Sequence, residues 1–236
     1  MIHERRKIRV LKADTDELVY DTAYTGPWTL ARCELSTPAV QTNLVQVPGR
    51  DGLIDLMPGL TDGVPRYKQR ELTIRLECSE SDRAYRIGLI DDIVNLLDGY
   101  TFRFVLPDDP TRAIRGKASV AVDYNDINHC SVTVSAVCDP WRIALDPVLI
   151  DLEAESTAKT IVLRNNGRRR AVPILACYDV APAMPDITVT SGSFTAHLTD
   201  YASHQYDALH LDYREERVLS YSGSGHLTFS WREAIL

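Results

Sequence analysis

The chain has 236 residues, of which 44% are hydrophobic and 25% charged, and its formal net charge is −7. This is ordinary globular composition, long enough for one large or two smaller β domains. The negative charge disfavours broad binding to a nucleic-acid backbone. No apolar run approaches the roughly 20 residues of a membrane-spanning helix, and the N-terminus lacks the apolar core of a secretory signal.

The first 47 residues predict strands. Residues 8–11 and 18–20 flank a polar turn at 14–16, which is typical of a hairpin. Residues 28–35 and 40–47 are two further extended runs, rich in Thr, Val and aromatic residues. Thr25-Gly26-Pro27 breaks the chain between these pairs.

Residues 47–78 predict a β-hairpin arm. The stretch opens with the turn PGRDG, in which Gly49 and Gly52 can adopt positive φ. An extended run at 53–57 and a breaker cluster at 58–65 follow. Residues 71–78 then alternate polar and apolar side chains, the period of a half-buried strand. Two extended runs joined by this tip form a hairpin that is marginal alone in water, so we expect a neighbouring subunit to cover its apolar residues.

A helix is predicted over residues 81–98. Asp82 and its neighbours offer an N-cap and an acidic first turn. Gly99 is placed to end the helix. Arg83 and Arg86 are expected on the polar face. The apolar positions recur at helical spacing and predict one buried face: Leu89, Ile90, Ile93, Val94, Leu96 and Leu97.

The remaining sequence predicts further strands and a second domain. Cys138-Asp139-Pro140-Trp141 is expected to halt one ladder, and residues 146–156 carry few signals, so the domain boundary is placed between 145 and 146. Seven short extended runs then follow, which favours a β-sandwich. They are separated by turn residues, among them Asn165-Asn166-Gly167 and Ser222-Gly223-Ser224-Gly225.

Several of these features together resemble one family. The turn at 47–52, followed by Tyr67 and Arg70 leading into a strand, resembles the N-terminal domain of siphophage distal tail proteins (Dit). Asn165-Asn166-Gly167 with Ala171 and Pro173, and a last strand ending in Trp231-Arg232-Glu233, are similar to their C-terminal domain. The order of elements agrees over nearly the whole chain.

The resemblance implies a mainly β fold in two domains. Residues 1–145 would form a tail-tube-like, β-sandwich-like domain with one helix and the arm, and residues 146–236 a galectin-like β-sandwich. It further implies a non-enzymatic protein of the virion, located at the distal end of the tail and synthesised in the host cytoplasm without a signal peptide. No cofactor, metal, membrane or nucleic-acid contact is expected.

The partners implied are six copies of the chain in a ring, the major tail tube protein, a tail-associated or tail-tip protein, and receptor-binding proteins. The arm residues expected at the subunit interface fall into two groups. The apolar ones would be covered by the neighbour: Leu53, Ile54, Leu56, Met57 and Leu60. The others would fix the angle of the arm: Arg50, Asp51, Tyr67 and Arg70.

Catalytic and metal sites are weakly indicated. The pairs Asp91-Asp92 and Asp108-Asp109 are consecutive residues, which do not face each other across a cleft as a glycosidase requires. A loose group contains His197, His204 and His210 but has no tight metal-ligand spacing. The cysteines show no CxxC pattern and are expected to be reduced: Cys33, Cys78, Cys130, Cys138 and Cys177.

Two alternatives remain open. The second domain could be a carbohydrate-binding adhesion module with Tyr213, Tyr221 and Trp231 as stacking platforms, although buried core aromatics are the competing interpretation. The chain could instead be a tail-tube protein. Two basic clusters, at 5–7 and 168–170, are interpreted as solvated strand ends and a turn, with binding to nucleic acid or to an acidic partner surface as the alternative.

Overall fold

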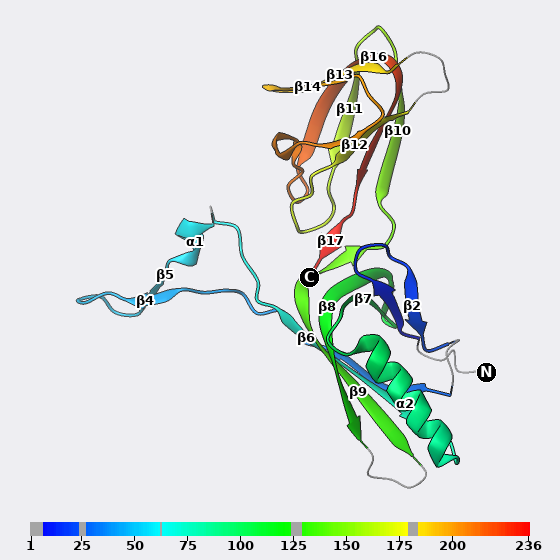
Figure 1. The fold of residues 1–236 in the computed structure, drawn as a ribbon. Coiled ribbons are helices and arrows are strands. Elements are labelled where there is room, and N and C mark those ends of the chain that lie inside the picture. The colour runs from blue at the N-terminus through cyan, green and yellow to red at the C-terminus, as the bar shows by residue number, and fades with distance from the viewer. Residues whose placement is uncertain (1–6, 24–26, 62, 124–128, 179–183) are drawn as a thin grey trace, which may run out of the picture. The chain divides into compact units, whose positions relative to one another are not determined.

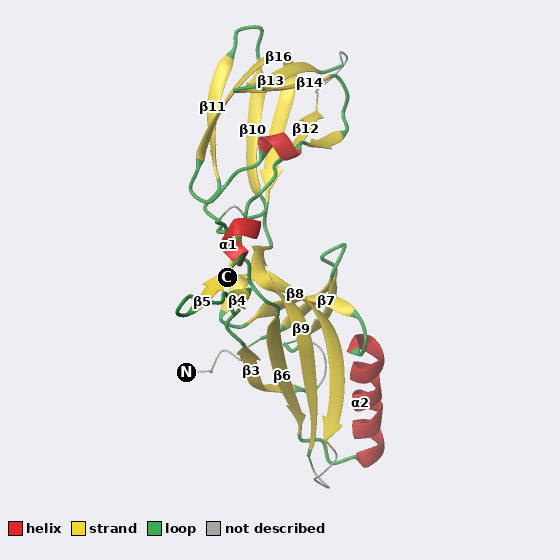
Figure 2. Cartoon of the chain, turned by 90° about the vertical axis from the view of Figure 1, so that its left-hand side faces the viewer, coloured by secondary structure: helices red, strands yellow, loops and turns green. Residues whose placement is uncertain are grey.

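The computed structural model describes residues 7–23, 27–61, 63–123, 129–178 and 184–236. The chain divides into two compact units, Met1–Arg142 and Ile143–Leu236 (Figures 1 and 2). The mainly β fold is confirmed. Two sequence features named above lie partly outside the described residues: the first basic cluster, at Arg5-Arg6, and the chain break, at Thr25-Gly26. His3 and the turn-forming residues Asn125-Asp126-Ile127-Asn128 also lie outside them.

Unit 1 is built on one sheet with the strand order β2-β1-β7-β8-β9-β6-β3. The last two residues of β9 belong to unit 2. The strands of this sheet are β1 (Arg9–Lys12), β2 (Leu18–Asp21), β3 (Thr29–Leu35), β6 (Arg70–Cys78), β7 (Thr101–Leu106), β8 (Asp109–Asp123) and β9 (Cys130–Ala144).

Helix α2 (Arg83–Leu97) packs on this sheet (Figure 2). The Asp82 carboxylate accepts the N–H of Ala84 at 2.8 Å and caps the helix, and Gly99 follows the last turn with φ of 80°. Ile90, Ile93 and Leu97 are buried in the core of the unit.

One prediction about α2 was wrong. Arg86, expected on the polar face, is buried, and its guanidinium donates to the carbonyl of Glu80. Its long stem covers apolar surface while the charged head finds a backbone acceptor.

The arm differs from the predicted hairpin. β4 (Leu44–Gln46) pairs with β5 (Leu53–Asp55), and the turn between them is the predicted PGRDG turn. The short helix α1 (Met57–Leu60) follows β5, at the end of the expected extended run and the start of the expected breaker cluster. β6 is not part of the arm, because it pairs with β9 and β3 and buries its apolar face in the core of unit 1.

Unit 2 is a two-layered β-sandwich. One layer has the order β10-β16-β12-β15 and the other β11-β16-β13-β14. Its elements are β10 (Val148–Ala154), β11 (Lys159–Arg164), β12 (Ile174–Tyr178), β13 (Asp186–Ser191), β14 (Phe194–Leu198), β15 (Ser203–Gln205), the 3-10 turn η1 (Asp207–Leu209), β16 (Glu216–Trp231) and β17 (Ala234–Ile235).

β16 runs through both layers of unit 2 as one strand, so the turn predicted at 222–225 was wrong. Its first half pairs with β11 and β13, and its second half with β10 and β12. The chain bends at Gly223 (φ 139°) and Gly225 (φ 117°) without leaving the ladder. A Cβ on Gly223 would collide with the carbonyl oxygen of Asp186, so only glycine allows this approach.

Three other expectations are corrected near the domain boundary and the end of unit 2. β9 continues past Pro140 to Ala144 instead of halting. β10 occupies a stretch in which no strand was expected, and it buries Val148, Ile150 and Leu152 against the core. One of the seven short extended runs predicted for the second domain, residues 209–213, forms only isolated bridges, at Leu211 and Tyr213.

Candidate functional site

The arm, residues 36–69, leaves the main sheet of unit 1 after β3 and returns to it at β6 (Figure 1). The segment that leaves the sheet forms backbone hydrogen bonds with later residues of the arm at two places. Near the base, Lys68 N–H donates to the Ala39 carbonyl at 2.8 Å and Gln41 N–H to the Arg66 carbonyl at 2.8 Å. Further out, β4 pairs with β5, so backbone hydrogen bonds support the arm both at its base and near its tip.

The tip of the arm is a tight turn between β4 and β5. Arg50 N–H donates to the Val47 carbonyl at 3.2 Å. Gly49 and Gly52 have φ of 79° and 81°, the left-handed region in which a side chain is disfavoured. Arg50 and Asp51 are exposed at this tip.

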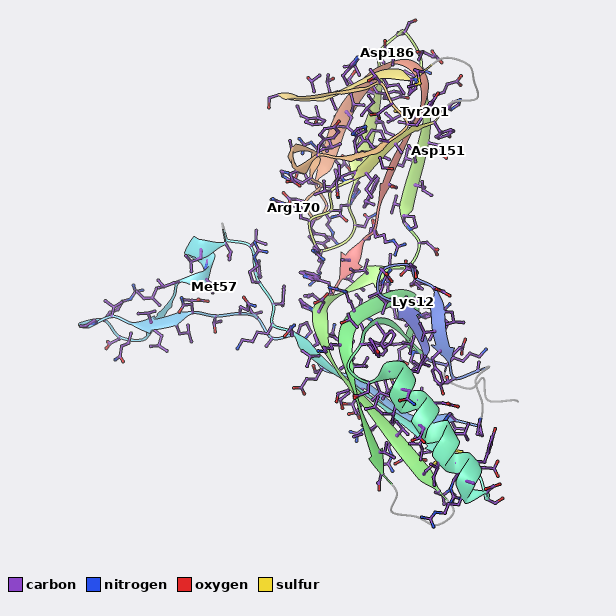
Figure 3. All side chains as sticks on the ribbon, viewed as in Figure 1. Lys12, Met57, Asp151, Arg170, Asp186 and Tyr201 are labelled. Carbon is purple, nitrogen blue, oxygen red and sulfur yellow. The ribbon has the colours of Figure 1, made fainter. Side chains whose placement is uncertain are left out.

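Asp55 organises the change from strand to helix behind the tip. Its carboxylate accepts the N–H of Asn43 at 2.9 Å, across the hairpin, and the N–H of Met57 at 3.0 Å, at the start of α1. One carboxylate therefore satisfies two backbone donors and fixes α1 beside β5. Figure 3 shows Met57 at this place in the arm.

The apolar side chains of the arm lack cover. Leu53 is 57% exposed, Leu60 is 71% exposed and Leu56 is 43% exposed. Ile54 and Met57 are half-buried. Sequence reasoning missed further members of this surface, although each occurs in the extended or breaker runs of the arm: Val40, Leu44, Val45, Val47 and Val64.

This concentration is unusual for a free surface. Eight large hydrophobic side chains are exposed between residues 40 and 64, among the described residues of a segment that has no core of its own. Exposed large hydrophobic side chains that are concentrated in one segment are typical of protein–protein contacts. The arm is therefore the strongest candidate for a functional surface in unit 1.

Tyr67 and Arg70 hold the base of the arm rather than its tip. The Tyr67 ring meets the Trp141 ring edge to face, with centroids 5.5 Å apart. Arg70 is buried, and its guanidinium donates to the carbonyls of Ser36 at 2.7 Å and Pro140 at 3.4 Å. Of the nine predicted interface residues, these two thus lie at the base of the arm and join it to the rest of unit 1.

The predicted sugar platforms are not brought together on a surface. Tyr221 is 6% exposed and Trp231 is 4% exposed, and both belong to the core of unit 2 because they lie on the inward face of β16. Only Tyr213 is exposed, with the Arg214 guanidinium 4.9 Å above its ring. For Tyr221 and Trp231 the competing interpretation as buried core aromatics is therefore the one that the structure supports.

The titratable residues considered for catalysis have structural contacts. Asp109 pairs with Arg142 at 3.1 Å and with Arg112 at 3.4 Å. His204 contacts Asp200 at 2.7 Å, and this contact holds the pKa of the Asp200 carboxyl below its usual value. Within the described part of the chain, no three His, Cys, Asp or Glu side chains are grouped as metal ligands.

The cysteines are thiols, and four of the five are buried. Burial raises the pKa of Cys138 to about 12 and that of Cys177 to about 11. Such thiols are inert core residues rather than nucleophiles.

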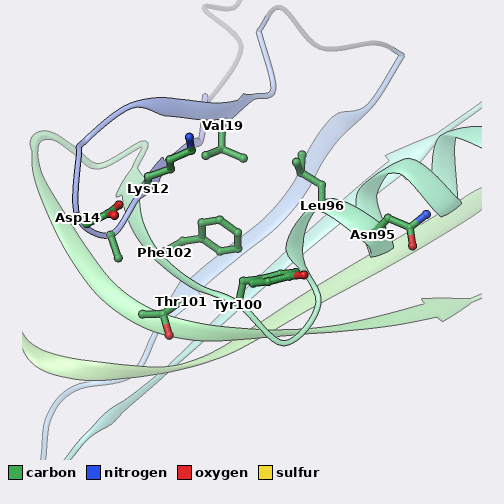
Figure 4. A pocket seen from close by; sticks show the side chains of 9 residues that line it. Lys12, Asp14, Val19, Asn95, Leu96, Tyr100, Thr101 and Phe102 are labelled. Atoms are coloured by element: carbon green, nitrogen blue, oxygen red, sulfur yellow. The ribbon is translucent and has the colours of Figure 1, made fainter.

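A shallow hollow of about 610 Å³ lies between the β1–β2 hairpin, the end of α2 and the start of β7. Figure 4 shows the rings of Tyr100 and Phe102 on one side of it and Lys12 on another. The Lys12 ammonium pairs with Glu17 at 2.6 Å. The residues that line the hollow include no nucleophile with an adjacent base, so they do not form an active site.

No helix within the described residues has the length and apolar character needed to cross a bilayer. No protein-family model matches the sequence, and no curated protein sequence matches it.

Solved structures do match. The crystal structure of the SPP1 Dit (gp 19.1) protein, described as a paradigm of the hub adsorption apparatus in phages that infect Gram-positive bacteria, is similar with a TM-score of 0.64 and 14% identity. The match covers 97% of this chain and 99% of that chain. The phage P2 baseplate in its activated conformation matches with TM-scores of 0.44 (with Ca, 10% identity) and 0.42 (with Sr, 9% identity). Each P2 match covers 97% of this chain and 98% of the other.

The SPP1 match establishes the fold. The chain shares the fold of the SPP1 Dit protein over nearly its whole length. The resemblance drawn from the turn at 47–52 and the later motifs is thereby confirmed at the level of the fold.

Proposed function

We propose that this chain is a structural distal tail protein of a phage or prophage and that it forms a hexameric ring. In that role it joins the tail tube to the tail tip and anchors receptor-binding proteins. The observation that carries the proposal is the arm, which exposes eight large hydrophobic residues on a fold shared with the SPP1 hub protein.

The physical argument concerns what covers the arm. Fully burying a Leu or Val side chain contributes about 1.5–3 kcal/mol, and roughly half of that remains available for side chains that are half-exposed. A second copy is the natural source of cover, because an arm on one surface and its receiving surface elsewhere make a head-to-tail contact. Such contacts close into a ring when the rotation between copies allows it.

A structural rather than catalytic role is supported by the use of the charged residues. The carboxylates that a hydrolase would need are engaged by arginines, as Asp109 is, or are exposed on one helix, as Asp91 and Asp92 are. Neither arrangement places two carboxyl groups across a cleft.

The mass of the purified protein in solution tests the proposal. We expect a species of six times 26.5 kDa, about 159 kDa, that persists on dilution. A stable dimer would contradict the ring, and growth into long tubes would favour the tail-tube alternative.

A second candidate, carbohydrate binding by unit 2, is favoured by one observation. Tyr178 is 44% exposed and its ring stacks on His226, with centroids 5.1 Å apart and planes within 14°. Glu153 lies opposite His226 on β10, so a ring face and a carboxylate acceptor are aligned across neighbouring strands. Sugars present apolar faces and hydroxyl donors. The Tyr178 ring could stack on the apolar face of a sugar, and the Glu153 carboxylate could accept a hydrogen bond from its hydroxyl group.

Glycan-array binding by the full chain tests this candidate. Binding that disappears in Tyr178→Ala and persists in Tyr85→Ala, a similarly exposed tyrosine on α2, would support it. Binding that Tyr178→Ala leaves unchanged would exclude Tyr178, His226 and Glu153 as the site.

A further inference from the structure

The turn that follows β11 carries three consecutive arginines, and hydrogen bonds restrict the conformation of its backbone. Asn165, at its start, is fully buried. Its amide Nδ2 donates to the carbonyls of Arg169 at 2.8 Å and Leu211 at 3.1 Å, and its Oδ1 accepts the N–H of Gly167 at 2.9 Å. The side chain thus fills both its donor and acceptor roles inside the turn.

The C-terminal strand holds the same turn from outside. Arg168 N–H donates to the Ala234 carbonyl at 2.7 Å. The Glu233 carboxylate accepts the backbone N–H of Asn166 at 3.0 Å and its side-chain amide at 3.1 Å. A Cβ on Gly167 would lie 2.6 Å from the backbone nitrogen of Ala234, so the two segments are in close contact. A turn fixed in this way loses little conformational entropy when it binds a partner.

The turn displays positive charge. Arg168, Arg169 and Arg170 are exposed. Arg170 forms a two-pronged contact with Asp212, at 2.7 and 3.3 Å, and holds the pKa of that carboxyl below its usual value. Among the described residues, no hydrogen bond or ion pair reaches the guanidinium groups of Arg168 and Arg169. Figure 3 shows Arg170 at the border of unit 2.

An exposed aromatic residue adjoins the arginines. Tyr213 forms a bridge with Asn165 and is 41% exposed, and the guanidinium of Arg214 lies over its ring. Arg214 N–H donates to the Asn165 carbonyl at 2.9 Å, which ties this corner to the turn. The arginine-turn surface consists of Arg168, Arg169, Arg170, Tyr213 and Arg214.

We propose that the arginine-turn surface binds an acidic surface of a partner protein, with the Arg168 and Arg169 guanidinium groups engaging its carboxylates. The inference stands on the turn itself and does not depend on ring formation. It gives a function to the second basic cluster of the sequence, which the proposed ring does not use.

The composition of the surface favours a protein partner. Arginine and tyrosine are the residue types enriched at the energetic centres of protein–protein interfaces. The Arg170–Asp212 contact shows that a guanidinium on this turn meets a carboxylate with its two prongs.

The backbone of the turn disfavours a phosphate ligand. Phosphate sites on turns use free backbone N–H groups that converge on the anion. Here the N–H groups of Asn166, Gly167 and Arg168 are all taken by acceptors of the chain itself. The formal net charge of −7 also opposes binding to a polyphosphate backbone.

Binding of the full chain to fluorescein-labelled poly-L-glutamate of about 20 residues, measured by anisotropy at about 50 mM NaCl, tests the proposal. Arg168→Gln/Arg169→Gln is expected to weaken binding by about tenfold, because two charge-assisted contacts are lost. Arg115→Gln/Lys117→Gln removes the same charge from exposed positions on β8 and should change affinity less than about twofold. Arg168→Lys/Arg169→Lys should bind between the native chain and the Gln variant, because lysine keeps the charge without the planar fork.

Two results would overturn the proposal: undiminished poly-glutamate binding by a folded Arg168→Gln/Arg169→Gln chain, or tighter binding of the native chain to inorganic polyphosphate of equal charge. The unfolding temperature of each variant establishes that it is folded. The solution mass of the same variants reports the ring separately, so a failure of either idea can be distinguished from a failure of the other.

Discussion

Arg70 and Ser36 are joined across the base of the arm, where the Arg70 Nε donates to the Ser36 carbonyl at 2.7 Å. Ser36 is the first residue of the arm and Arg70 the first after it. Glu71 adds two more hydrogen bonds to Ser36: its N–H donates to Ser36 Oγ at 2.8 Å and its carbonyl accepts Ser36 N–H at 2.9 Å. The two ends of the arm, residues 36–69, are thus fastened at one point.

Replacing Arg70 should loosen this fastening. Arg70→Gln removes donors to two backbone carbonyls in a buried setting, and we expect a loss of about 1–3 kcal/mol in the free energy of unfolding, measured by urea denaturation. Arg75→Gln, on the exposed side of the same strand, should change stability by less than about 0.5 kcal/mol. Equal effects of the two substitutions would contradict the assigned role of Arg70.

Polar substitution on the arm should separate assembly from folding. Leu53→Ser/Ile54→Ser/Leu56→Ser is expected to give a folded monomer, because these side chains contribute little to the core of unit 1 but supply the apolar surface proposed to bind a neighbour. Multi-angle light scattering after size exclusion measures the mass. A matched triple variant in unit 2, Leu149→Ser/Val162→Ser/Val218→Ser, alters side chains of similar exposure and should leave the ring intact. A ring formed by the arm variant would disprove the role of the arm.

Two glycines of the α2 region should respond to alanine with opposite signs. Gly99 has φ of 80°, so Gly99→Ala places a Cβ in the left-handed region and should destabilise unit 1 by about 1 kcal/mol. Gly88 lies inside α2, where a Cβ would meet no other atom within 4 Å, so Gly88→Ala should stabilise the helix by about 0.5–1 kcal/mol. Thermal unfolding followed by circular dichroism checks both, and shifts in the same direction would refute the account.

The buried thiol of Cys138 should make stability fall at high pH. Its pKa is about 12 in the folded chain against 9.0 as the ordinary value, so the folded state holds the proton more tightly. The associated stability is therefore complete below pH 9 and is lost progressively as the pH rises from about 9 toward 12.

Comparison of native protein with Cys138→Ala isolates this effect from other titrating groups. The native-minus-variant difference in unfolding free energy should shrink by about 1.4 kcal/mol between about pH 7 and pH 10, because each pH unit above the ordinary pKa removes about 1.4 kcal/mol. Ser135→Ala, on the same strand, should show no such pH dependence relative to native protein. A constant native-minus-Cys138→Ala difference would rule out a buried neutral thiol.

Local sequence patterns predicted much of the fold. α2 lies within the predicted residues 81–98, because its cap, apolar spacing and terminal glycine are all local signals. The alternation of β6 was equally visible, but alternation identifies a half-buried strand and not its partner. The sequence therefore could not tell a strand of the arm from a strand of the core, and only the pairing of β6 with β9 and β3 decides this.

The candidate site was predictable in part for the same reason. The apolar residues of the arm and its turn glycines are visible in the sequence, whereas the support from Tyr67 and Arg70 at the base depends on Trp141 and Pro140, which are distant in the sequence. The misplaced sugar platforms had a usable signal. Leu227, Phe229 and Trp231 alternate with Thr228 and Ser230, which already indicates that the aromatic side faces inward.

β16 gives unit 2 a mechanical property that neither layer would have alone. Because one unbroken backbone serves as a ladder partner in both layers, the layers are held by peptide bonds as well as by side-chain packing. A pull on either layer is transmitted through β16 to the other. For one layer to slide against the other, the hydrogen bonds that β16 makes in both layers would have to break.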